Sequence, residues 1–307
     1  MTMRAADVYG RRARWLTLAP PFLFLAALFL APFAMIVRIS LSHSVRAQPP
    51  YAPAYAPGSG WEGVWRVVEG LDLQNYATIV SDDLYVAAFL TSLRIAATST
   101  LLLVLVGYPI AYAMARAQPK LQPVLVALMM VPFWTSFLIR IYAWIGILKP
   151  EGLLNQALIG AGVISEPLEI LNTEGAIFIG VVYAYLPFMV LPIYAVLVAQ
   201  DESLLEAAAD LGSPPWKSFW LVTIPLSAPG VAAGCLLCFI PIVGEFIIPD
   251  MLGGSDTLMI GRQLWSEFFS NRDWPSASAI AVLMVVILLI PFFVLRRLES
   301  RGEEALL

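Results

Sequence analysis

The chain has 307 residues, of which 60% are hydrophobic and only 13% charged. It is therefore far more apolar than an ordinary soluble domain, and its repeated apolar runs are long enough to cross a bilayer. A net charge of −4 without a long basic run argues against a nucleic-acid partner. These features predict a polytopic membrane protein.

Hydropathy predicts six membrane-spanning helices, each long enough to cross a hydrocarbon core of about 30 Å. They cover Leu16–Ile39, Ile95–Ala115, Val124–Leu148, Ala176–Val198, Ala228–Ile248 and Ala277–Leu295. The first run has no clear signal-peptidase site, so we expect it to stay as an uncleaved span. The fold class expected is all-α.

Lys and Arg set the orientation, because they accumulate on the cytoplasmic side. With the N-terminus inside, ten of them fall on the inner segments and five on the outer ones. Both termini are then cytoplasmic, as residues 1–15 and 297–307, and residues 40–85 form an outer loop.

The outer loops combine acids with aromatic residues. Thirteen acids, Asp250 among them, face five bases. Acids and aromatic rings together suit an alkylammonium ion. The alternative is that positive-inside bias removes bases from this side and aromatics gather at membrane interfaces.

The third span carries an aromatic stripe. Trp134, Phe137, Ile141 and Trp144 recur at steps of three and four residues, which predicts one shared helix face. Packing against lipid or helices is the ordinary role of such a stripe, and the alternative is a cavity wall for a cation. Tyr183 and Tyr185 in the fourth span raise the same alternatives.

A short polar segment, residues 200–225, separates the fourth and fifth spans on the predicted inner side. Ala207, Ala208 and Ala209 favour a helix, and Gly212 suits its C-terminal cap. Glu206 and Asp210 are four residues apart and share a face.

Glu245 is a carboxylate with apolar neighbours near the end of the fifth predicted span. A charge there is costly unless it is paired or faces water. We expect Glu245 either to line a translocation cavity or to pair internally with Arg140 or Arg94. Cys235 and Cys238 are interpreted as packing residues, because a metal or redox pair needs further ligands.

The segment from Glu206 keeps a known spacing: E-A-A, three residues, G, nine residues, then Val222 and Ile224-Pro225. It resembles the EAA loop of type I ABC-importer permeases, whose fold is MetI-like. The resemblance implies a transmembrane domain over residues 86–296 and a coupling helix that docks on a separate ATPase. The coupling residues implied are Glu206, Ala207, Ala208, Asp210, Gly212, Ile224 and Pro225.

Three further segments are similar to spermidine/putrescine permeases: Val131–Trp144, Gly244–Gly254 and Met259–Pro275. The likeness implies an inner-membrane subunit that imports polyamines by alternating access. Implied partners are an ATPase dimer, a second homologous permease, a periplasmic polyamine-binding protein and membrane lipid. The substrate-pathway residues expected are Glu245, Trp134, Tyr142, Trp144, Tyr183 and Asp250.

The chain lacks the G-x-x-x-x-G-K-[ST] phosphate-binding motif, so we expect no cofactor here, with ATP and Mg²⁺ on the partner ATPase. A different small amine or an opine-like amino-acid derivative remains an alternative substrate. A secondary transporter driven by an ion gradient would leave the EAA spacing unexplained. An intramembrane enzyme would need a nucleophile or metal set that the sequence does not offer.

Overall fold

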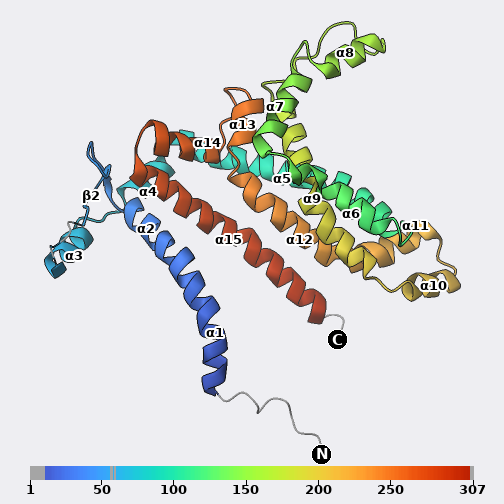
Figure 1. The fold of residues 1–307 in the computed structure, drawn as a ribbon, viewed down its shortest axis with the longest axis horizontal. Coiled ribbons are helices and arrows are strands. Elements are labelled where there is room, and N and C mark those ends of the chain that lie inside the picture. Colours follow the sequence, from blue (N-terminus) through green and yellow to red (C-terminus); the bar gives the residue numbers. More distant parts are fainter. Residues whose placement is uncertain (1–10, 56–57, 59, 305–307) are drawn as a thin grey trace, which may run out of the picture. The chain divides into compact units, whose positions relative to one another are not determined.

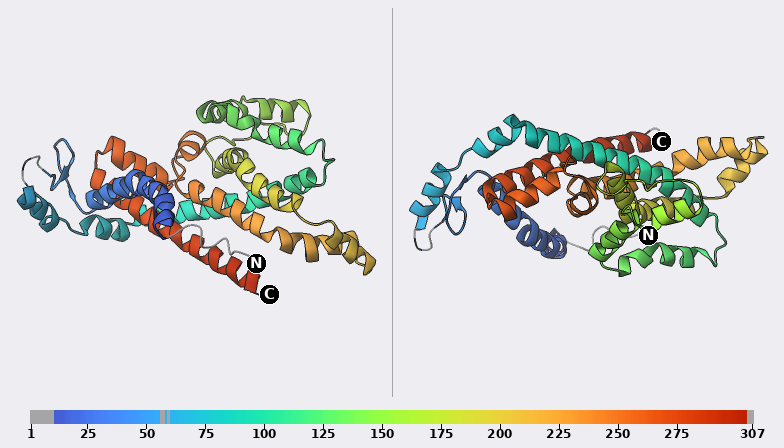
Figure 2. Two further views of the ribbon diagram at one scale, coloured as in Figure 1. Left: turned by 60° about the horizontal axis from the view of Figure 1, so that its bottom comes forward. Right: turned by 90° about the horizontal axis from the view of Figure 1, so that it is seen from above.

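The computed structural model describes residues 11–55, 58 and 60–304, so residues 1–10 of the expected N-terminal segment and 305–307 of the tail lie outside it. Two compact units are present. One comprises residues 1–81 with 266–285, and the other comprises 82–265 with 286–307. Figures 1 and 2 show the helices of both.

The larger unit is built from helices that enclose one apolar core. In chain order they are α5 (Asp83–Ala115), α6 (Gln122–Met130), η3 (Val131–Trp134), α7 (Phe137–Leu148), α8 (Leu153–Gly160), α9 (Glu174–Val198), α10 (Ser203–Asp210), α11 (Pro215–Ser218), η4 (Phe219–Thr223), α12 (Ile224–Val243), α13 (Ile247–Leu252) and α14 (Ile260–Trp265). Helices α5, α9 and α12 pack side by side at its centre (Figure 1). Their facing side chains, including Leu103, Ile193 and Ile242, are fully buried.

Small residues bring α12 close to α9. Gly230 and Gly234 form a G-x-x-x-G pair on one face of α12. A Cβ on Gly234 would lie 2.8 Å from the sulfur of Met189 and 3.1 Å from its carbonyl oxygen. Backbones that approach this closely are typical of membrane helices, which associate through tight packing rather than through the hydrophobic effect.

The chain is broken where the sequence predicted one span over 124–148. The helical pair Gln122–Trp134 and Phe137–Gly160 is bent by 88°. Pro132 supplies no N–H, η3 tightens into a 3₁₀ turn, and Thr135 is extended (φ −103°, ψ 151°). The prediction that Trp134 shares a helix face with Phe137 and Trp144 is therefore wrong, because the break separates them.

The fifth predicted span also differs in its bounds. The apolar helix there runs over Pro215–Val243 rather than Ala228–Ile248. It ends at Val243, so Glu245 lies between α12 and α13 and outside this helix.

Four helices in the described part of the chain are long and apolar enough to cross a membrane, or five if the bent pair is one span. They are Leu18–Ser40, Asp83–Ala115, Glu174–Val198 and Pro215–Val243. Helix α15 (Trp274–Glu304) adds a shorter apolar stretch over Trp274–Ile290. The count of six spans stays a prediction.

The smaller unit holds the first apolar helix and the segment after it. Its elements are α1 (Arg11–Leu25), η2 (Ala26–Leu30), α2 (Ala31–Ser40), β1 (His43–Ser44), β2 (Tyr51–Ala52), α3 (Gly60–Glu69), α4 (Gln74–Ser81), η5 (Ser266–Ser270) and the first turns of α15. The two strands pair antiparallel, with His43 opposite Ala52.

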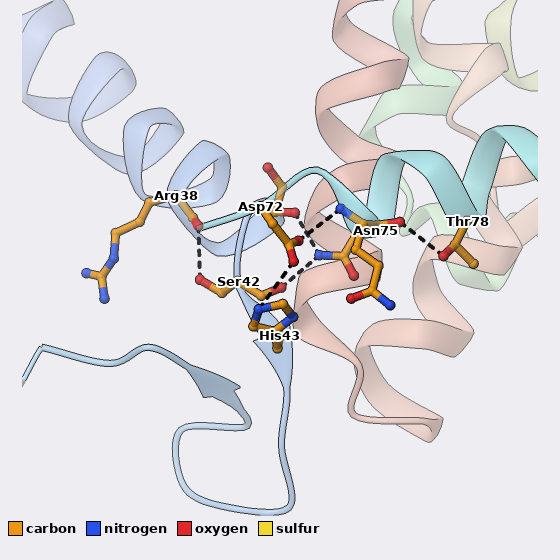
Figure 3. Close-up of polar contacts among 8 residues, drawn as sticks. Arg38, Ser42, His43, Asp72, Asn75 and Thr78 are labelled. Carbon is orange, nitrogen blue, oxygen red and sulfur yellow. Dashed lines mark hydrogen bonds and ion pairs between the residues drawn. The ribbon is translucent and has the colours of Figure 1, made fainter. Parts of the chain in front are cut away.

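Polar side chains fasten α4 to the end of α2 (Figure 3). The amide of Asn75 donates to the carbonyl oxygens of Ser40 and Ser42, at 2.8 and 2.7 Å. His43 lies 3.4 Å from the carboxylate of Asp72. The two hydrogen bonds from Asn75 satisfy carbonyls at and just after the end of α2, where helical partners are missing.

Candidate functional site

The segment between α9 and α12 folds as its sequence predicts locally. Residues Ser203–Asp210 form α10, and Gly212 follows with φ +78°. The N–H of Ser213 donates to the carbonyl of Ala208, and that of Gly212 to Ala209, at 3.0 and 2.8 Å. This is a Schellman cap, which requires a left-handed residue where Gly212 stands.

Both acids of α10 are exposed: Glu206 and Asp210 have no ion pair within the described chain. Ala207 is exposed and Ala208 half-buried, so α10 presents a face of small side chains beside two carboxylates. At the start of the segment, a hydrogen bond from the N–H of Ser203 lowers the pKa of the Asp201 carboxyl. An ordinary aspartate is already ionised at neutral pH, and this hydrogen bond favours the ionised form further.

Large apolar side chains on and beside α10 remain exposed in the described part of the chain. Leu204 is 46% exposed, Leu211 89% and Trp216 68%. Exposed apolar groups gathered at one place indicate an interaction surface. These three residues were not predicted from the sequence as part of the site. Large apolar residues on and beside a polar helix are the signal that could have identified them.

Ile224 and Pro225 stand where η4 passes into α12. Ile224 is half-buried against the core, and Pro225 is exposed. A proline removes one helical N–H and crowds the carbonyl four residues earlier. The π turn over Phe219–Thr223 accommodates both effects, so the helix continues without a break.

Glu245 is 8% exposed and accepts hydrogen bonds from neutral groups. The hydroxyl of Tyr185 donates to Oε2 at 2.7 Å, and the N–H of Ile247 to Oε1 at 3.0 Å. Neither arginine considered from the sequence pairs with it. Arg94 pairs with Glu174, and the guanidinium of Arg140 lies over the rings of Phe133 and Phe137.

The remaining pathway candidates do not form one cluster. Trp144 and Tyr183 meet edge to face, with ring centroids 5.4 Å apart. Trp134 and Tyr142 are exposed, at 82% and 64%, and do not join that contact. Asp250 is exposed and forms an ion pair with Arg262 at 3.1 Å.

Comparison with known proteins agrees with this architecture. Residues 103–302 match the family described as "Binding-protein-dependent transport system inner membrane component". The chain is 41% identical to the spermidine/putrescine transport system permease protein PotB of Haemophilus influenzae, over 74% of this chain and 79% of that one. It is also 41% identical to PotB of Escherichia coli, over 70% and 78%.

Solved structures share the fold at low sequence identity. A permease chain of a bacterial alginate ABC transporter has a TM-score of 0.67 at 15% identity, covering 93% of this chain and 96% of that one. A chain of the MetNI methionine ABC transporter has a TM-score of 0.54 at 16% identity, covering 71% and 95%. These chains establish a type I ABC importer fold, and the chain belongs to the family of inner-membrane components of binding-protein-dependent transport systems.

Proposed function

We propose that this chain is the permease subunit of an ATP-driven polyamine importer and forms half of its translocation path. The observation that carries the proposal is 41% identity to PotB permeases over about three-quarters of the chain. Putrescine is the substrate proposed first, and spermidine the second. The acids and aromatic groups of the predicted outer loops agree with a cationic substrate.

The energy for transport comes from a separate ATPase dimer that carries ATP and Mg²⁺. Helix α10 docks on it through its small-residue face, and Glu206 meets a basic group of the ATPase. The exposed Leu204, Leu211 and Trp216 support this, because an apolar surface beside two carboxylates matches an apolar cleft with a basic rim.

Two more proteins complete the transporter. A second, homologous permease contributes the other half of the path, and a periplasmic binding protein delivers the polyamine to the outer face. ATP binding closes the ATPase dimer, moves the coupling helices and opens the cavity outward. Hydrolysis returns the cavity to the inward-open state.

Uptake of radiolabelled putrescine tests the proposal, in cells without their own polyamine importers. The chain is expressed with its ATPase, second permease and binding protein. We expect wild-type uptake, and Glu206→Lys should reduce it at least tenfold because the charge on α10 is reversed. Lys120→Glu, a charge reversal at an exposed residue of the predicted inner side outside α10, should transport normally.

The outcomes separate the parts of the proposal. An assembled complex that takes up no putrescine or spermidine contradicts the substrate. Uptake that continues without the ATPase contradicts the mechanism and favours a transporter driven by an ion gradient. Uptake by Glu206→Lys equal to wild type contradicts the role of Glu206.

A further inference from the structure

Three aromatic rings connect a guanidinium to the buried carboxylate in the larger unit. The ring of Phe133 meets that of Phe188 edge to face at 5.1 Å, and Phe188 lies 6.0 Å from Tyr185. Tyr185 donates to Glu245, and Arg140 lies over Phe133 at the other end. We call Phe133, Phe188 and Tyr185 the aromatic row.

The row is open on one side. Phe188 is 40% exposed, while Phe133 and Tyr185 are half-buried. A charged group at each end makes lipid an unsuitable cover, because a charge in hydrocarbon costs several kcal/mol. Water, substrate or protein therefore faces this side of the row.

Arg140 is bound by aromatic faces rather than by acceptors. Its guanidinium carbon lies 5.7 Å from the centroid of Phe133 and 5.5 Å from that of Phe137. Its Nε and Nη1 are buried and have no hydrogen-bond partner within the described chain. A guanidinium held this way occupies the position that an alkylammonium would take on the same rings.

Glu245, at the other end, has no cationic partner among the described residues. The groups that donate to it, the Tyr185 hydroxyl and two backbone N–H groups, are all neutral. A second cation is therefore attracted to it without displacing an existing ion pair.

Given the proposed function, we propose that the aromatic row binds the polyamine during translocation, with one ammonium directed toward Glu245. A second ammonium lies on the faces of Phe133 and Phe188. Arg140 acts as a tethered cation that lies over Phe133 and Phe137 until the substrate displaces it from Phe133. The row then selects for amines that carry at least two charges, because one charge cannot engage both ends.

Three substitutions test this in the complete complex, measured by putrescine uptake over a range of concentrations. Phe188→Leu removes the π face and should raise KM roughly 2- to 30-fold, the range expected for one cation–π contact. Arg140→Gln should lower KM, because a competing cation is lost. Glu245→Gln should raise KM and abolish the preference for putrescine over a monoamine competitor.

Matched controls isolate the role of the ring. Phe188→Tyr keeps the π face and should restore KM toward wild type. Phe29→Leu makes the same change at an exposed ring of the first apolar helix and should leave KM unchanged. Co-purification of the ATPase and the second permease with each variant reports assembly.

Several results would overturn the inference. An unchanged KM in assembled Phe188→Leu and Arg140→Gln complexes would exclude the row from the path. Loss of the second permease from the Arg140→Gln complex would make Arg140 an interface residue instead. If wild type itself takes up no polyamine, the proposed function fails first, and that result is distinct from both.

Discussion

The end of α10 depends on the backbone conformation of one residue, Gly212. Its φ of +78° is set by the Schellman cap, and a Cβ at this position would meet no atom within 4 Å. The demand is therefore purely conformational. A left-handed conformation costs an L-residue about 1–2 kcal/mol, and a β-branched residue tolerates it least.

We predict that Gly212→Val uncouples transport. The cap would open or shift, α10 would present Leu211 and Glu206 differently, and substrate-stimulated ATP hydrolysis by the complex should fall severalfold. Gly212→Asn is the matched control, because Asn adopts the left-handed conformation more readily. Normal stimulation in Gly212→Val would contradict the prediction.

For single residues, the sequence predicts the structure where neighbouring residues in the chain determine it. The Ala run, Gly212 and the following prolines predict α10 and its end without any tertiary contact. The partner of Glu245 could not be found in this way. Tyr185 lies 60 residues earlier in the chain and reaches Glu245 only because α9 packs against α12.

At the scale of elements, the main helices could be predicted from the local sequence, whereas the break within one of them could not. Apolar length located the main helices, because the free energy of placing a helix in lipid depends on the hydropathy of its side chains. The break at Thr135–Ser136 has a weaker signal, since prolines elsewhere in the chain, such as Pro187 in α9, leave the helix continuous. Whether a proline bends or breaks a helix depends on neighbours that hydropathy does not contain.

The G-x-x-x-G face of α12 supports an element-scale prediction. Gly234→Leu should destabilise the subunit by roughly 1–3 kcal/mol, because the added side chain meets the backbone of Met189 and cannot be relieved by a rotamer change. Thermal unfolding of the detergent-solubilised complex measures this. Gly146→Leu is the control, since a Cβ there meets nothing within 4 Å. Equal melting temperatures for the two variants would contradict tight packing of α9 on α12.

At the scale of the whole molecule, family membership places the chain in the inner membrane, while its detailed topology is still a prediction. Both termini lie in the cytoplasm only if the chain crosses the membrane an even number of times, as six spans would. Five described segments at most satisfy the length and hydropathy of a span, and the apolar start of α15 is the sixth candidate.

Reporter fusions test that topology. Green fluorescent protein after Leu307 should fluoresce, and alkaline phosphatase at the same point should be inactive, because both results indicate a cytoplasmic C-terminus. Phosphatase fused after Gly160, in the predicted outer loop following the third span, should be active. An active phosphatase after Leu307 would place the C-terminus outside the cytoplasm and contradict the predicted topology.

The helical run from Pro215 to Val243 has a mechanical consequence. It starts shortly after the Gly212 cap of α10 and stops just before Glu245. At 1.5 Å per residue, its 29 residues form a helix about 44 Å long. The run contains a π turn and the internal prolines Pro229 and Pro241, yet its helical path first ends at Gly244. A displacement of the chain beside α10 would therefore reach the turn of Glu245 through one helical element.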